Sequence, residues 1–179
     1  MTVAGLLSHI KNTKSKPIDI TKWKKFRITD LFDISGSTTT KKSILENSGS
    51  GIYPYVTTQA TNNGIFGYYA IQTEKGNCLT VDSAVLGTCF YQEKDFSASD
   101  HVEILTPKFV MSKNIALFLS TIINKTGSII GYNYAKKRSQ KALAQEVIYL
   151  PVTQDGSPDW EYMEQFIAEI YRCTYTLLA

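Results

Sequence analysis

Residues 52–71, with the sequence IYPYVTTQATNNGIFGYYAI, contain two short apolar runs separated by a polar turn. Aromatic and β-branched residues favour strands, and Asn62-Asn63-Gly64 is a turn signal because Asn and Gly tolerate left-handed backbone. We therefore predict that Ile52–Thr58 and Gly64–Ile71 form antiparallel strands joined by a hairpin. This predicted pair places the chain in a β-rich class.

The same pattern of short apolar runs broken by Gly and Asn continues on both sides of this hairpin. Trp23–Ile28 alternates apolar with basic residues, the period of a half-buried strand, and residues 36–51 form a polar connection. Further strands are expected at Cys78–Asp82, Ala84–Gln92 and His101–Leu105. Spacings of roughly ten residues favour antiparallel strands over βαβ units.

The period changes to a helical one in the last third of the chain. Asn114–Asn124 carries apolar residues at helical spacing, a shorter helix is expected over Ser139–Glu146, and Val147–Leu150 is a buried strand. Ser157 and Pro158 are a suitable N-cap and first residue for a long terminal helix. The predicted fold class is α+β: a β-rich domain of short antiparallel strands with a few helices, followed by a long C-terminal helix. We divide the chain into an N-terminal arm (1–21), a domain (22–156) and the helix (157–179).

An apolar stripe runs along the terminal helix at alternating spacings of three and four residues, the pattern of a coiled-coil seam. We predict that this stripe pairs with a second copy or with a partner subunit, which would use Trp160, Met163, Ile167, Ile170 and Leu177. The alternative is that the stripe packs on the domain's own sheet.

Composition excludes several classes of protein. A hydrophobic content of 43% is too high for a disordered chain, and three cysteines are too few for a disulfide framework. No apolar run approaches the roughly 18 residues that span a bilayer, and no secretory signal is recognisable. We therefore expect a cytoplasmic protein without a membrane association.

Charge is distributed in blocks although the net charge is only +3. Residues 1–45 carry a net +6 and residues 111–141 a net +6, with no acidic residue in the second block. Residues 46–110 and 142–179 carry −4 and −5. Such asymmetry indicates a polyanion partner, although it is also compatible with a mixed solvated surface.

Motifs of catalysis are missing from the sequence. The chain has two histidines, neither in a recognisable nucleophile motif, and no G-x-G-x-x-G sequence. Residues 36–43 (GSTTTKKS) lack the second glycine of a phosphate loop, and the scattered acids do not form a metal site. We predict no catalytic residues, no metal and no cofactor in this chain, and thus a binding protein.

Three stretches combine hydrogen-bonding side chains with cations and aromatics. Gln and Asn can read adenine, Arg and Lys can read guanine, and Lys, Ser and Thr suit phosphates. The predicted DNA-binding residues are Thr38, Thr39, Lys41 and Lys42; Thr57, Thr58, Gln59, Thr61, Asn62 and Asn63; and Tyr132, Asn133, Tyr134, Lys136, Lys137, Arg138 and Lys141.

Four segments in order resemble target recognition domains of the specificity subunits in type I restriction–modification systems, and of their type IIB and IIG relatives. They are Tyr53–Thr57, Asn63–Tyr68, Tyr132–Tyr134 before the basic run, and Leu150–Trp160. The resemblance covers roughly residues 22–171. One departure is Ala135, where relatives tend to carry Gly, so local contacts there can differ.

This resemblance implies a mechanism and partners. A full specificity subunit carries two recognition domains separated by antiparallel helices, and the chain resembles half of one. It would read half of a bipartite double-stranded DNA site and direct a methyltransferase subunit, and in some systems a restriction subunit. S-adenosylmethionine, ATP and Mg²⁺ would then be bound only by those partner subunits. A homodimer through the terminal helix or a longer two-domain chain would complete the reader.

Two other functions stay open on the sequence alone. One is the recognition part of a fused restriction–methyltransferase whose catalytic portion is absent. The other is a β-rich carbohydrate-type binding module in which the aromatics form a sugar platform. Salt-dependent DNA binding separates this last possibility from the others.

Overall fold

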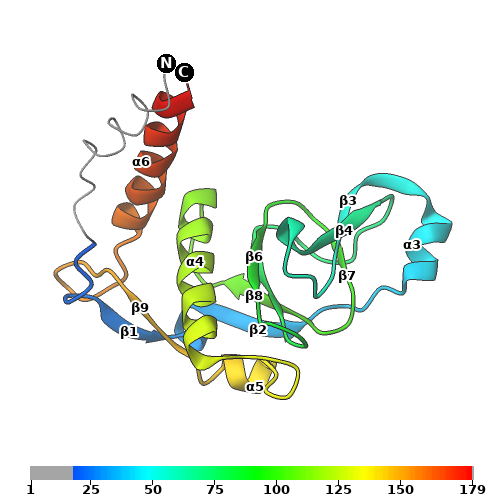
Figure 1. Ribbon diagram of the computed structural model, residues 1–179, viewed down its shortest axis with the longest axis horizontal. Helices are drawn as coiled ribbons and strands as arrows, with labels where there is room; N and C mark the ends of the chain where they lie inside the picture. The colour runs from blue at the N-terminus through cyan, green and yellow to red at the C-terminus, as the bar shows by residue number, and fades with distance from the viewer. Residues whose placement is uncertain (1–17, 179) are drawn as a thin grey trace, which may run out of the picture.

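The computed structural model describes residues 18–178, and for residues 176–178 it describes the backbone only. Most of the predicted N-terminal arm (1–21) therefore lies outside the described residues. The described chain folds into three small sheets and several helices, as Figure 1 shows. The predicted α+β class, with short antiparallel strands and a long C-terminal helix, is confirmed.

A four-stranded antiparallel sheet forms the centre of the molecule. Its strand order is β2 (Phe32–Gly36), β8 (Val102–Pro107), β5 (Cys78–Asp82) and β6 (Cys89–Gln92). A three-stranded sheet has the order β4 (Ile65–Tyr69), β3 (Ser50–Val56) and β7 (Ser97–Ala98). In it β3 pairs antiparallel with β4 and parallel with β7. A separate antiparallel pair joins β1 (Lys24–Arg27) to β9 (Val147–Leu150).

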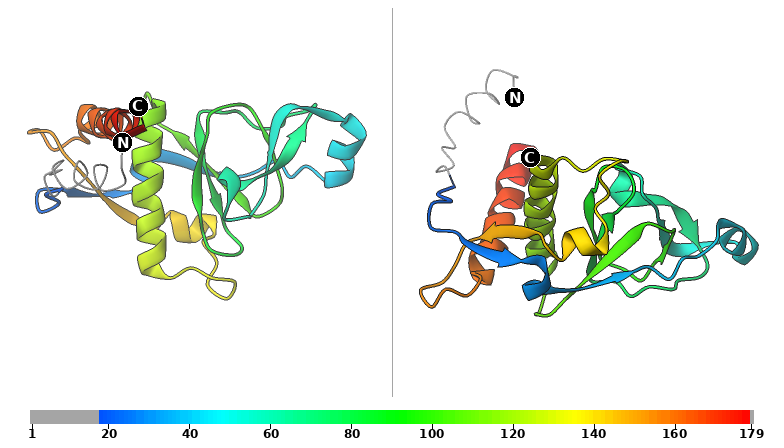
Figure 2. Two further views of the ribbon diagram at one scale, coloured as in Figure 1. Left: turned by 45° about the horizontal axis from the view of Figure 1, so that its top comes forward. Right: turned by 90° about the horizontal axis from the view of Figure 1, so that it is seen from below.

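Helix α4 (Lys113–Ile130) lies between two parts of the molecule (Figures 1 and 2). On one side are α6 (Trp160–Leu178) and the β1–β9 pair, and on the other are the two larger sheets. The short helices are α2 (Ile28–Leu31), α3 (Lys42–Ser48), α5 (Gln140–Leu143) and the 3₁₀ turn η1 (Asn62–Gly64). Helix α3 lies at the end of the molecule opposite α6.

Alternation of side chains along β5 and β8 builds two cores, one on each face of the four-stranded sheet. Leu79, Val81 and Leu105 face α4 and join the larger core with Phe118 and Leu119. The intervening residues of the same strands face the three-stranded sheet, where they form the second core of Val56, Cys78, Phe96, Ala98, Val102 and Ile104. The four-stranded sheet is therefore covered on both faces, so a binding surface is expected in the loops at its ends.

Three boundaries differ from the sequence prediction. The connection 36–51 contains α3, whose apolar Leu45 is buried. Residues 84–88 are not part of a strand, because the Asp82 carboxylate accepts hydrogen bonds from four backbone N–H groups of residues 84–87. Helix α4 continues past the predicted stop at Lys125–Gly127 and ends at Gly131, which has a left-handed φ of 74°.

The terminal helix begins two residues later than predicted. Asp159 rather than Ser157 caps it, because its Oδ1 atom accepts a hydrogen bond from the backbone N–H of Tyr162 (2.9 Å). The helix itself starts at Trp160, so Pro158 precedes it.

The apolar stripe of α6 is divided between core and solvent. Met163 is fully buried, so the prediction that it faces a partner is wrong. Trp160 stacks on Phe109 at 4.0 Å and is half-buried. Ile167 packs against the core, whereas Ile170 is 47% exposed. The side chain of Leu177 lies outside the described residues.

None of the helices over residues 18–178 is both long and apolar enough to cross a bilayer.

Candidate nucleic-acid interface

The first two predicted stretches meet at one end of the three-stranded sheet. Ala98 of β7 pairs with Val56 on one side and with Thr39 on the other. Both pairings are parallel. The chain therefore leaves both segments at the same end of the sheet. The ammonium of Lys42 lies 4.9 Å from the centre of the Phe66 ring on β4, which links the two stretches again.

In the first stretch the backbone is anchored while the side chains point outward. The N–H of Thr38 donates to Glu74, and Lys41 occupies the N-cap position of α3 without capping it through its side chain. Lys42 forms an exposed ion pair with Glu46 at 3.5 Å. Thr38, Thr39, Lys41 and Lys42 are all exposed, so their side chains are accessible to a partner.

The second stretch is a compact loop held by its own amides. Asn62 and Asn63 adopt left-handed φ angles of 51° and 54°. The Nε2 group of Gln59 donates to the carbonyl oxygens of Ile65 (2.6 Å) and Thr61 (3.2 Å), which uses both of its N–H groups. Gln59 therefore has no free amide donor for a base edge in this conformation, whereas Asn62 donates only one N–H, to Ile65. The loop's hydroxyl residues Thr57 and Thr58 are half-buried, and Thr61 is exposed.

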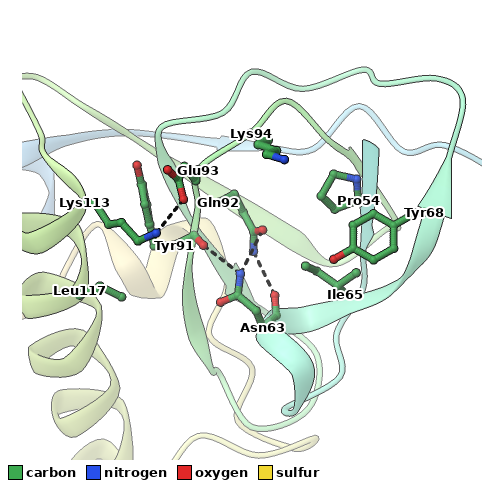
Figure 3. Close-up of a pocket in the computed structure, with 10 residues that line it drawn as sticks. All are labelled: Pro54, Asn63, Ile65, Tyr68, Tyr91, Gln92, Glu93, Lys94, Lys113 and Leu117. Atoms are coloured by element: carbon green, nitrogen blue, oxygen red, sulfur yellow. Dashed lines mark hydrogen bonds and ion pairs between the residues drawn. The ribbon is translucent and has the colours of Figure 1, made fainter. Parts of the chain in front are cut away.

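Asn63 connects this loop to the central sheet. Its Nδ2 group donates to the carbonyl oxygen of Tyr91 (2.9 Å), and the Gln92 amide donates back to the carbonyl oxygen of Asn63 (3.1 Å). Figure 3 shows these contacts along one side of a groove of about 300 Å³, with Pro54 and Tyr68 facing them from the hairpin. The loop is thus fixed to the C-terminal end of β6.

In the third stretch some side chains are exposed to solvent, and others form hydrogen bonds that stabilise the loop. Asn133 Oδ1 accepts hydrogen bonds from the N–H groups of Ala135 (2.9 Å) and Lys136 (3.0 Å), which closes a tight turn. Tyr134 is 78% exposed, with the ammonium of Lys137 5.7 Å from the centre of its ring. Lys136, Lys137 and, on α5, Lys141 are exposed as well.

Arg138 does not belong to this exposed surface, so the expectation that it contacts DNA is corrected. Its side chain is fully buried and forms an ion pair with the buried Glu146 at 2.6 Å. The guanidinium also donates to the carbonyl oxygens of Gly87 (2.6 Å) and Ile123 (2.9 Å). A Cβ at Gly127 would lie 2.7 Å from Arg138 Nη1, which explains why glycine stands there inside α4. Arg138 therefore anchors the loop instead of reading DNA.

Tyr132 completes the same buried network. Its hydroxyl donates to Glu146 Oε1 at 2.8 Å, and its ring lies 5.3 Å from the guanidinium carbon of Arg138. Burial and this hydrogen bond raise the pKa of Tyr132 to about 12. The Tyr132 hydroxyl therefore contacts a core carboxylate, and the prediction that Tyr132 binds DNA then depends on its half-buried ring.

Strand β6 joins the second and third stretches. Arg138 binds Gly87 just before the strand, and Asn63 binds Tyr91 and Gln92 at its end. The four residues of β6 span about 13 Å. At a rise of about 3.4 Å per base pair this length corresponds to about four base pairs of duplex DNA.

One element of this region was missed by the sequence reasoning, the turn between β5 and β6. It is held by Asp82 and exposes the adjacent aliphatic side chains Val85 and Leu86. A buried apolar strand ending in Asp82-Ser83, with Gly87 four residues after Ser83, is a turn signal that would have revealed it.

Within residues 18–178 no three His, Cys, Asp or Glu side chains are placed to hold a metal ion. His101 lies 3.7 Å from Asp100, but both side chains are solvent-exposed at a turn where His101 has a φ of 61°.

Comparisons with known proteins agree on one family. A family model described as the type I restriction modification DNA specificity domain matches residues 20–176. The chain is 28% identical over 158 residues to the specificity subunit S.BcgI of a type II restriction enzyme from Heyndrickxia coagulans. That match covers 85% of this chain and 45% of the relative.

Two solved structures share the fold. The S subunit of a type I restriction–modification system from M. genitalium matches with a TM-score of 0.58 and 14% identity, over 96% of this chain and 46% of that one. The HsdS subunit from Thermoanaerobacter tengcongensis matches with a TM-score of 0.60 and 12% identity, over 88% and 39%. The chain thus spans less than half the length of each of these relatives. Because the family model covers most of the chain, the protein belongs to the type I restriction–modification DNA specificity domain family.

Proposed function

We propose that this chain reads one half of a bipartite double-stranded DNA site as the specificity component of a restriction–modification system. The observation that carries this proposal is the arrangement along β6, where a four-residue strand about 13 Å long separates the attachment points of two polar loops. Loop 57–64 is bound at one end of the strand and loop 131–138 at the other. A surface of this length fits about four base pairs.

The charge of the α4–α5 segment supports DNA as the partner. The α4–α5 segment exposes Lys136, Lys137 and Lys141 beside the exposed ring of Tyr134. Residues 111–141 contain no acidic residue that would neutralise these lysines within the segment. Lysines of this kind bind phosphates, and amide and hydroxyl groups such as those of Asn62 and Thr61 are suited to base edges.

In this proposal the chain directs other subunits and performs no chemical step itself. Methyltransferase subunits would bring S-adenosylmethionine, and a restriction subunit, where present, would bring ATP and Mg²⁺. Support comes from the family, whose model is described as a DNA specificity domain.

Salt-dependent DNA binding tests the proposal. Each neutralised phosphate adds about −0.9 to the slope of log K against log salt, so four to six contacts give a slope of about −4 to −5. Replacing Lys137 and Lys141 together with Ala should flatten the slope by about 2. The matched control is Lys25→Ala, an exposed lysine of β1, which lies on the other side of α4 from β5 and β6. A slope that the double variant leaves unchanged would place the DNA elsewhere.

The distal half of α6 is the surface that we propose for pairing with a second copy or with a second recognition half. Its first half is occupied by α4, but Ile170, Tyr171 and Tyr175 are exposed. Ile170→Asp should therefore dissociate a dimer in sedimentation and leave the circular dichroism unchanged. Ile167→Asp, which places a charge against the core, should instead lower the free energy of unfolding by about 2–4 kcal/mol. A wild type that sediments as a monomer at high concentration would overturn self-pairing.

A further inference from the structure

The turn between β5 and β6 carries two adjacent aliphatic side chains that the core does not use. Val85 is 44% exposed and Leu86 is 56% exposed. Single exposed aliphatic residues are ordinary on protein surfaces. These two differ because the backbone beneath them is rigid.

The rigidity comes from the carboxylate of Asp82, which is buried at the end of β5. It accepts hydrogen bonds from the N–H groups of Ala84 (2.8 Å), Val85 (3.1 Å), Leu86 (2.8 Å) and Gly87 (3.2 Å). The N–H of Ser83 donates to the carbonyl oxygen of His101 (2.9 Å). Turning Val85 and Leu86 inward would break these bonds and leave a buried carboxylate without donors.

The same turn lies beside the basic loop 131–138. Arg138 binds the carbonyl oxygen of Gly87, and Leu86 lines a groove of about 440 Å³ together with Ser128, Gly131 and Tyr132. The apolar tip and the exposed lysines of the loop are therefore held in a fixed relation by one buried guanidinium. A ligand that binds Lys136 and Lys137 would therefore also lie next to the apolar side chains of this turn.

DNA offers a small apolar group that matches this tip. In the major groove the C5-methyl group of thymine is the apolar feature of an A·T pair, and aliphatic side chains contact it. A protein partner fits less well, because a stable interface needs about 800 Å² on each side and two side chains supply a small fraction of that area.

We propose that Val85 and Leu86 form a thymine-reading tip that contacts a C5-methyl group in the major groove while the lysines of loop 131–138 hold the flanking phosphates. The inference rests on the proposed function and assigns one of its specificity-determining contacts. Asp82 and Arg138 are positioning residues for this tip.

The test uses uracil, which pairs as thymine does but lacks the C5-methyl group. The full chain selects duplexes from a randomised library amplified with dTTP, and from the same library amplified with dUTP. The proteins are wild type, Leu86→Ala, Val85→Ala and the control Val110→Ala. Val110 is an aliphatic residue like those of the tip and is 94% exposed. It lies before the N-terminal end of α4, whereas the tip lies beside the C-terminal end.

With the dTTP library, wild type should enrich a motif that contains an A·T pair at a fixed position. With dUTP the preference at that position should fall about fourfold, the effect of removing one buried methyl group, while the other positions are unchanged. With the dTTP library, Leu86→Ala should show the same reduced A·T preference that wild type shows with the dUTP library. Exchanging dTTP for dUTP should not reduce the preference of this variant further. Val110→Ala should behave as wild type.

Two results would overturn the inference while leaving the proposed function intact. One is an identical motif with equal enrichment from both libraries. The other is a Leu86→Ala variant that keeps the wild-type difference between the libraries, or that binds all sequences more weakly by the same factor, as expected for a wedge or backbone contact. If wild type enriches no sequence from either library, sequence reading by this chain, and the inference with it, is wrong.

Discussion

The β3–β4 loop (57–64) and the α4–α5 loop (131–139) are both polar and rich in turn residues, but they are attached to the molecule in different ways. The β3–β4 loop is held by neutral amides, which donate to carbonyl oxygens of the loop itself, of β4 and of β6. The α4–α5 loop is held by a charged side chain, Arg138, which reaches three separate segments of the core. The first loop is therefore attached by neutral hydrogen bonds, whereas the second moves only if a buried ion pair breaks.

This difference predicts where mutations destabilise the protein most. Arg138→Ala removes one partner of a buried pair and leaves Glu146 charged in the core. We expect the free energy of unfolding to fall by about 3–5 kcal/mol in urea denaturation. The adjacent control, Lys137→Ala, removes an exposed charge and should change it by less than about 0.5 kcal/mol.

A loss below about 1 kcal/mol for Arg138→Ala would contradict the anchoring role. Replacing Arg138 and Glu146 together with Met sharpens the comparison. A buried pair exchanged for apolar side chains costs little, so the double variant should recover part of the stability that the single variant loses.

Arg138 also shows where the sequence stops being informative. Residues 136–138 are three consecutive cations, and nothing in their order distinguishes the buried guanidinium from its two exposed neighbours. The distinction arises from Gly87 and Ile123, which are distant in sequence, and from the space that Gly127 leaves inside α4. Local pattern cannot encode such contacts.

By contrast, the features that depend on local periodicity were predictable. The hairpin around Asn62-Asn63-Gly64, the strand Cys78–Asp82 and the existence of α4 and α6 follow from short-range patterns of apolar and turn residues. The apolar stripe of α6 was visible, but its division between Met163 in the core and Ile170 in solvent was not. That division depends on how far α4 extends along α6, which is a tertiary property.

The β3–β4 loop should respond more mildly to mutation, and its response can be separated into two causes. Asn63→Ala removes the hydrogen bond to Tyr91 and places at a φ of 54° a residue that tolerates left-handed backbone less well than Asn does. We expect a loss of about 1–2 kcal/mol in the free energy of unfolding. Asn63→Gly removes the same hydrogen bond but tolerates the left-handed backbone, so its loss should be smaller.

Urea denaturation of both Asn63 variants makes the comparison quantitative. Equal losses for Ala and Gly would mean that the left-handed conformation carries no cost at this position. A loss as large as that of Arg138→Ala would contradict the distinction between the two loops.

The smallest effect concerns the hydroxyl of Tyr132, and pH reveals it. Tyr132→Phe removes one hydrogen bond to Glu146, which should lower the free energy of unfolding by about 1 kcal/mol at pH 7. Burial and that hydrogen bond raise the pKa of Tyr132 to about 12 in the folded protein, whereas an unfolded tyrosine ionises near its usual value of about 10. Between these values the unfolded state has lost a proton that the folded state keeps, so the stabilisation from this hydroxyl declines as pH rises.

The gap in stability between wild type and Tyr132→Phe should therefore be constant up to about pH 10 and should narrow towards pH 12. Burial also raises the pKa of Cys78 and of Cys89 to about 12, but both thiols are present in the two proteins and their contribution cancels from the difference. Tyr149→Phe is the matched control, because this tyrosine is half exposed and its hydroxyl has no hydrogen bond in the described part of the chain. A gap for Tyr132→Phe that stays constant or widens through this pH range would mean that the hydroxyl is not held against Glu146. The α4–α5 loop would then lose its second attachment to the core, and Arg138 alone would fix its position.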